Sequence, residues 1–219
     1  MKRRTLMVAT GAIAVTVFAS GAAIYKANQP QTVPAQAPAP ANTLVRMHSP
    51  VIGPVDAPVT IVEFFDPSCE ACRAFYPIVK QLLVQTGDKA RLVLRYTPLH
   101  EGSDEVVRII EAARRQDRFQ PVLEALLERQ PEWAVHGAPD IEKAWQIAAS
   151  AGMDLTRGRQ DAMTPVVDGI LAQDIADVQA NRIEQTPTFF VNGQPLTDFS
   201  PQGLFDLVKK EFDATQRGS

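Results

Sequence analysis

Cysteine is scarce in this sequence, since its 219 residues contain only two, Cys69 and Cys72. This excludes the framework of several disulfides that is typical of small exported domains without a large core. Histidine is scarce as well, and His48, His100 and His136 are scattered along the chain. A closed structural zinc site needs about four ligands. The composition therefore gives no support to such a site.

The sequence also lacks a surplus of basic charge. Its 22 lysines and arginines are outnumbered by 25 acidic residues, which gives a net charge of -3 at pH 7. Proteins that bind nucleic acids usually carry a basic patch or excess, so we expect no nucleic-acid partner. No internal repeat is visible. With 45% hydrophobic residues, the chain is long enough to bury the core of one domain with additions.

Charge is absent from a long segment near the N-terminus. Lys2-Arg3-Arg4 precede an apolar stretch from Leu6 to Tyr25. This pattern predicts an export signal within residues 1–27, cleaved after a small residue. The stretch is also long enough to span a bilayer, so a retained anchor with its positive end inside is an alternative. In both cases we expect an exported, periplasmic location that permits disulfides, with the domain soluble after cleavage or tethered to the inner membrane.

Residues 28–44 are rich in proline, alanine and glutamine and show no apolar periodicity. We interpret them as a semi-extended linker between the N-terminal segment and the folded domain. The segment from Gln29 to His48 is too short for a separate dimerisation domain, and the sequence does not define an oligomeric state.

Strand and helix patterns alternate from residue 59 onward. Residues 59–65 are β-branched and aromatic, which predicts a strand buried on both faces. Helical spacing follows to about Gln85, and residues 91–96 predict a second strand. Strand, helix and strand at this spacing predict a βαβ unit with a right-handed crossover. Residues 103–182 then keep helical spacing, which predicts an insertion of three or four helices.

The C-terminal part returns to strand patterns. Residues 185–191 predict a strand, which the turn Asn192-Gly193 closes into a hairpin. Pro195 places the short partner strand at a sheet edge. A last helix is predicted with Ser200 as its N-cap and Pro201 at its first position. The fold class is therefore α/β, a mixed central sheet with helices on both faces.

Cys69-Glu70-Ala71-Cys72 follows the first predicted strand through Asp66-Pro67-Ser68. We expect a helix capped by Ser68, with Cys69 at its start, where the helix dipole lowers the pKa of a thiol. Cys72 would be the resolving thiol. A disulfide over this spacing constrains little of the unfolded chain, so we favour reversible disulfide chemistry. Two alternatives stay open: a dithiol that binds copper(I) as a chaperone does, and an inert disulfide in a non-catalytic interaction scaffold.

Glu63 is a charged residue within an otherwise apolar strand. We expect it to be buried near Cys72, with a raised pKa, where it could relay a proton. His100, which follows Pro98-Leu99, could sit near the site, but we favour a surface or helix-capping role.

Two segments and the helical insertion between them resemble the DsbA-like branch of the thioredoxin superfamily. The segments run from Glu63 to Cys72 and from Gln185 to Gly193, and the resemblance covers about residues 45–214. It implies a thioredoxin fold with an inserted helical subdomain, and thiol–disulfide exchange with cysteine-containing exported proteins. It also implies no cofactor beyond the redox-active disulfide Cys69–Cys72, and a membrane redox partner that reoxidises or reduces the protein.

The resemblance also assigns individual residues. Cys69 matches the attacking thiolate and Cys72 the resolving thiol. Thr186-Pro187 matches the family's cis-proline loop, whose backbone pairs with an extended substrate. Glu63, six residues before Cys69, matches the buried acid beneath the active site.

The dipeptide between the cysteines departs from the Pro-His of the strongly oxidising members. Glu70-Ala71 lacks a cationic partner and adds an anion. A negative charge near the Cys69 thiolate raises its pKa and destabilises the reduced form. The sequence therefore predicts a weaker oxidant than a Pro-His member, and the direction, oxidase or isomerase and reductase, stays open.

Overall fold

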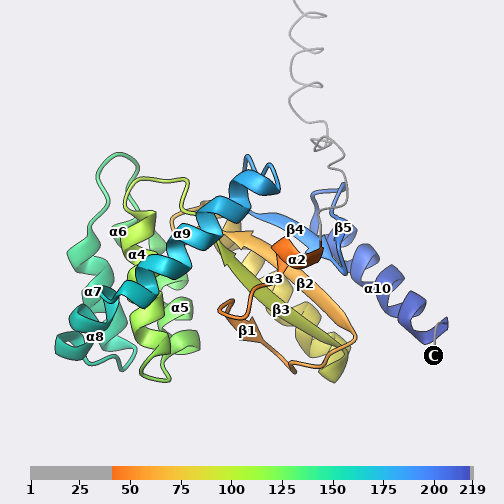
Figure 1. Ribbon diagram of the computed structural model, residues 1–219, viewed down its shortest axis with the longest axis horizontal. Coiled ribbons are helices and arrows are strands. Elements are labelled where there is room, and N and C mark those ends of the chain that lie inside the picture. Colours follow the sequence, from red (N-terminus) through yellow and green to blue (C-terminus); the bar gives the residue numbers. More distant parts are fainter. Residues whose placement is uncertain (1–40, 218–219) are drawn as a thin grey trace, which may run out of the picture.

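The computed structural model describes residues 41–217 (Figure 1). The predicted signal or anchor in residues 1–27 lies outside these residues, as does most of the predicted linker. The end of that linker differs from the prediction, because it forms the short helix α2 (Ala41–Leu44). Within residues 41–217, no helix is both long and apolar enough to cross a membrane.

A five-stranded mixed sheet forms the centre of the domain, in the order β1-β3-β2-β4-β5. The strands are β1 (Val51–Ile52), β2 (Val59–Phe65), β3 (Ala90–Tyr96), β4 (Thr188–Val191) and β5 (Gln194–Pro195). The pair β2–β3 is parallel, with Val59 opposite Ala90 and Phe65 opposite Tyr96, and the other three pairs are antiparallel. The predicted βαβ unit and the edge position of Pro195 are confirmed. The two-residue strand β1 was not predicted, since it is too short to show an alternation.

Helices cover both faces of the sheet (Figure 1). Successive side chains of β2 point to opposite faces. Ile61 and Phe65 join the core cluster that includes residues of α3 (Glu70–Thr86) and α10 (Pro201–Arg217). Val62 and Phe64 lie in a second cluster with Leu44 of α2 and residues 178 and 183. Because side chains alternate along a strand, Glu63 shares the α3 face with Ile61 and Phe65.

The predicted helical insertion contains more helices than the three or four expected. They are α4 (Ser103–Arg114), α5 (Phe119–Glu128), α6 (Gln130–Trp133), α7 (Ile141–Ser150), α8 (Leu155–Ala162) and α9 (Pro165–Ala180). Helices α4 to α8 gather beside the sheet, and α9 returns across it (Figure 1). The short helices α6 and α8 were missed because they hold too few residues to show a periodic apolar stripe.

Two predicted terminal features are confirmed. The Ser200 hydroxyl accepts the Gly203 N–H at 2.9 Å, so it caps α10, which begins at Pro201. Asn192 and Gly193 adopt φ angles of 47° and 83° between β4 and β5, the left-handed conformations that a tight hairpin turn of this sequence requires.

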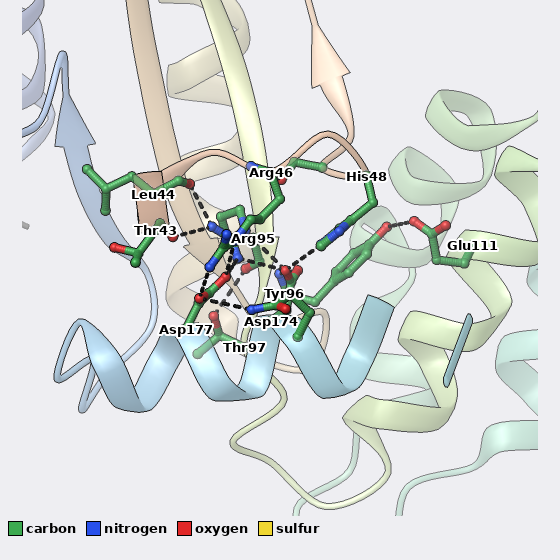
Figure 2. A network of polar contacts seen from close by, with 12 residues as sticks. Thr43, Leu44, Arg46, His48, Arg95, Tyr96, Thr97, Glu111, Asp174 and Asp177 are labelled. Atoms are coloured by element: carbon green, nitrogen blue, oxygen red, sulfur yellow. Dashed lines mark hydrogen bonds and ion pairs between the residues drawn. The ribbon is translucent and has the colours of Figure 1, made fainter. Parts of the chain in front are cut away.

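A buried ionic network attaches residues 43–49, here called the N-terminal strap, to the face of the sheet that α9 covers (Figure 2). Arg95 of β3 is fully buried, and its five N–H groups all find acceptors: the Asp174 and Asp177 carboxylates of α9, and the backbone carbonyls of Thr43 and Leu44. Two strap side chains also join the network: Arg46 pairs with Asp177 at 2.6 Å, and His48 pairs with Asp174 at 2.7 Å.

Candidate active site

The turn between β2 and α3 places Cys69 at the start of the helix. Cys69 is itself the N-cap of α3, and its Sγ accepts the Cys72 N–H at 3.5 Å. The prediction of Ser68 as the cap was wrong. The Ser68 N–H donates to Asp66 instead, and its hydroxyl pairs with the Ser103 hydroxyl at 2.7 Å. The reactive sulfur thus directly faces the unpaired amide groups of the first helical turn.

The two thiols have opposite acidities. The pKa of the Cys69 thiol is lowered to about 6, and the largest cause is the hydrogen bond with the Cys72 side chain. Further hydrogen bonds with Thr186 and the backbone lower the pKa too, and together these bonds outweigh burial, which raises it. The pKa of the Cys72 thiol is raised well above 9.0. The largest cause is burial, since Cys72 is fully enclosed, and the hydrogen bond to Cys69 and the charge of Glu63 add to it. At neutral pH, Cys69 is therefore the thiolate and Cys72 keeps its proton.

The Thr186-Pro187 peptide bond is cis, as the family resemblance implied. The loop lies against the cysteines, because the Cys69 Sγ is 3.2 Å from the Thr186 carbonyl oxygen. A backbone segment held this close to the thiol can pair with an extended chain that presents a sulfur to Cys69.

Glu63 is fully buried on the α3 face, and neither carboxyl oxygen has a hydrogen-bond partner within the described part of the chain. Burial, together with the charge of Cys69, raises the pKa of Glu63 well above its usual value of 4.5. An unpaired carboxyl group in such a position holds its proton at pH values where an exposed glutamate is ionised.

Replacing Glu63 by glutamine is expected to change how stability depends on pH. Below pH 4.5 the carboxyl is protonated in both the folded and the unfolded chain, so its ionisation costs nothing. Above that value the unfolded state ionises and the folded state does not, which lowers wild-type stability by up to about 1.4 kcal/mol per pH unit. Glu63→Gln removes this loss, so its stability relative to wild type should rise from pH 4.5 to 7.5 in urea titrations. A constant difference would contradict the raised pKa.

Asp66, which the sequence did not single out, holds the active-site turn together. Its buried carboxylate accepts the N–H groups of residues 68, 99 and 100, the Ser103 hydroxyl at 2.5 Å, and the His100 Nδ1 at 2.8 Å. Its own N–H donates to the Cys72 Sγ at 3.5 Å. One residue therefore connects the resolving thiol, the start of α4 and His100.

Gln130 of α6 is a second residue that the sequence did not reveal. Its buried Nε2 donates to the carbonyl oxygens of Pro67 and Cys69, at 2.8 and 3.0 Å. The helical insertion thus supports the redox turn directly. A glutamine at a helix boundary carries no local signal for a partner about 60 residues away.

His100 and His136 line a small pocket that reaches Ser68, the residue before Cys69. The pocket is lined in part by Ser68, His100, Glu101 and His136. The Glu70 carboxylate lies 2.8 Å from His136 Nε2, and the rings of His100 and His136 are 5.9 Å apart. The interpretation of His100 as a surface or capping residue missed this position. Ala71 is partly buried and packs against the core.

Comparisons with known proteins agree with the fold. A family model described as thioredoxin matches residues 46–210. A thioredoxin-like oxidoreductase from Silicibacter pomeroyi DSS-3 is 30% identical, with a TM-score of 0.69 over 83% of this chain and 100% of that chain. α-DsbA1 from Wolbachia pipientis has a TM-score of 0.69 at 17% identity, over 80% of this chain and 96% of that chain, which confirms the DsbA-like fold.

One curated relative is named as a transport protein and not as an oxidoreductase. The Na(+)/H(+) antiporter NhaA of Herminiimonas arsenicoxydans is 32% identical over 169 residues, which cover 76% of this chain and 25% of that protein. This chain thus spans about a quarter of the length of the curated relatives that it matches.

Proposed function

Because the chain belongs to the thioredoxin family, we propose that it is an exported thiol–disulfide oxidoreductase that acts on cysteine-containing proteins. The observation that carries the proposal is the position of Cys69: a thiol with a pKa of about 6, at a helix N-cap, 3.2 Å from the carbonyl oxygen of a cis-proline loop. An inert disulfide or a structural thiol needs none of these features.

In the proposed reaction, the Cys69 thiolate attacks one sulfur of a substrate disulfide. That S–S bond breaks, a mixed disulfide forms, and the second substrate sulfur leaves as a thiolate that takes a proton from water. Cys72 then loses its proton and attacks the Cys69 sulfur. The Cys69–Cys72 disulfide forms, the substrate is released as a dithiol, and two electrons have passed from protein to substrate. The reverse sequence oxidises a substrate dithiol.

Two further residues support these steps. The backbone of Thr186, next to Cys69, would dock an extended substrate chain beside the cis-Pro187. Glu63 would relay the proton that Cys72 gives up, since burial raises the pKa of this carboxyl well above its usual value of 4.5. The family resemblance implies the first role, and the burial of Glu63 near Cys72 is the reason for the second.

The location and partners follow from the N-terminal sequence and the family. An export signal or anchor in residues 1–27 would place the domain in the periplasm, where a membrane redox partner would reoxidise or reduce it. The transport activity named for the antiporter relatives is not carried over, because the match covers about a quarter of their length.

Equilibration with glutathione tests the proposal and its direction. A Cys69 pKa of about 6 lies between those of about 3.5 for DsbA and about 7 for thioredoxin. We therefore expect a reduction potential between about -120 mV and about -270 mV, the values of those two proteins. A potential near -120 mV would contradict the weaker oxidant that Glu70 predicts. Failure of the pair to exchange with glutathione would overturn the proposed function.

A further inference from the structure

Two histidines from different segments line one pocket that reaches Ser68, the residue before the reactive thiol. His100, in the loop between β3 and α4, is held by the fully buried Asp66 carboxylate at 2.8 Å. His136, between α6 and α7, reaches the Glu70 carboxylate at 2.8 Å. Glu70 begins α3 and follows Cys69 directly. The fold thus places two imidazole rings where the dipeptide between the cysteines offers no cation.

The charged groups around His100 come from several elements. Asp66 precedes α3, Cys69 and Glu70 begin it, and Glu101 shares the pocket lining with His100 and His136. Burial lowers the pKa of His100, but the hydrogen bond and charge of Asp66, with the charges of Cys69 and Glu70, raise it overall. The ring is only about one-third exposed, so solvent screens these charges incompletely.

We infer that His100 and His136 are positioning residues for the Cys69–Cys72 redox equilibrium: His136 holds the Glu70 carboxylate, and the charge of the His100 imidazole makes the equilibrium depend on pH. The inference rests on the proposed function, because it concerns the same site. A reduced site carries a thiolate, which a nearby imidazolium stabilises, whereas the disulfide carries no charge to stabilise. Protonated imidazoles therefore favour the reduced form and make the protein a stronger oxidant.

This coupling changes the role expected for Glu70. The 2.8 Å contact with His136 gives the Glu70 carboxylate a partner, which reduces its effect on the Cys69 thiolate. Without that contact, Glu70 acts as an unpaired anion beside the thiolate. Histidine is the side chain that ordinarily changes charge between pH 5 and 8.

The test compares the glutathione equilibrium constants of wild type and the double variant His100→Gln/His136→Gln. Glutamine keeps a donor for Asp66 and Glu70 but does not titrate. At pH 6.5 the equilibrium constant for forming the reduced state should be about fivefold lower in the variant than in wild type. This corresponds to roughly a factor of two to three for each histidine–carboxylate pair that is removed, since both pairs are partly screened by solvent. At pH 8.5 the two proteins should agree within about twofold.

His48→Gln is the matched control, because His48 pairs with Asp174 in the strap network instead of lining the pocket. We expect it to follow wild type at both pH values. A double variant within about twofold of wild type at pH 6.5, or an equal change in His48→Gln, would overturn the inference while exchange itself persists. Loss of exchange in the wild type would instead reject the proposed function, and the inference with it.

A measurement on the unmodified protein avoids any folding defect of the variants. By reciprocal linkage, a thiolate that gains from the His100 charge must raise the pH at which His100 titrates. NMR titration of its ring proton should therefore show a higher midpoint in the reduced than in the oxidised protein. Equal midpoints in the two redox states would overturn the role of His100.

Discussion

Cys69→Ser is expected to abolish disulfide exchange, with a loss on the order of 10³-fold or more, because a hydroxyl does not ionise at neutral pH and cannot replace the attacking thiolate. The only other thiol, Cys72, is fully buried and has a pKa well above 9.0, so it cannot take over the attack. Reduction of insulin by a dithiol, followed by turbidity, measures the loss. Activity near the wild-type level would reject Cys69 as the nucleophile.

Cys72→Ser is the matched comparison, since it removes the other sulfur of the same motif. The Cys69 thiolate can still attack a substrate disulfide, but no second thiol releases the mixed disulfide that forms. Covalent complexes should therefore accumulate in Cys72→Ser, disappear on reduction, and be absent from Cys69→Ser. Because the Cys72 side chain lowers the pKa of Cys69 by hydrogen bonding, Cys72→Ala, which lacks a donor, should also give the initial attack a higher pH midpoint, whereas Cys72→Ser keeps a donor.

The parts of the site that are local in sequence could be predicted. Strand β2, the turn and the start of α3 lie within about a dozen residues, so the helix-start position of Cys69 follows from the spacing alone. The burial of Glu63 was predictable from its apolar neighbours in a central strand. The cis bond at Thr186-Pro187 required the family resemblance, because an X-Pro sequence does not by itself determine the isomer.

The parts that depend on distant contacts could not be predicted. His136 reaches Glu70 across 66 positions, and Gln130 reaches Cys69 across 61. These contacts are set by how the insertion packs beside the sheet, and periodicity indicates which residues are buried without indicating their partners. The cap error has a local cause. Ser68 is a good capping residue, but Asp66 and Ser103 engage it, and the cap moves to Cys69.

The partners of Arg95 could not be predicted either, because Arg95 lies in a strand whose other residues are mostly apolar. From the sequence alone, an exposed edge position was as good an explanation as a buried one. The structure pairs it with two carboxylates on α9, about 80 residues later, and with the strap. Only residues 43 and 44 of the strap belong to the predicted linker, and no apolar pattern indicated that the strap is docked.

Asp174→Ala is expected to destabilise the domain by about 3–5 kcal/mol, the cost of leaving a buried charge without its partner. Asp174 is fully buried and accepts from Arg95, His48 and the backbone N–H of Tyr96. Removing it leaves the Arg95 guanidinium in the core with only part of its acceptors. Chemical unfolding of the wild type and the variant at pH 7 measures the difference.

Asp168→Ala provides the matched control, because Asp168 lies on the same helix, α9, and also pairs with an arginine. Its partner Arg108 is 2.6 Å away, but the Asp168 side chain is 57% exposed, and exposed pairs of this kind contribute at most about 1 kcal/mol. A loss in Asp174→Ala no larger than that in Asp168→Ala would show that the buried network is not a main source of stability.

The same network reaches toward the redox turn, so Asp174→Ala should also affect exchange. Asp174 fixes the Tyr96 N–H at the end of β3, and the next residue, Thr97, donates its N–H to the Phe65 carbonyl just before Asp66. Loosening this end of β3 frees the loop that presents His100 to Asp66. We therefore expect the glutathione equilibrium of Asp174→Ala, measured well below its unfolding midpoint, to lose part of the pH dependence that His100 confers, whereas Asp168→Ala should retain it.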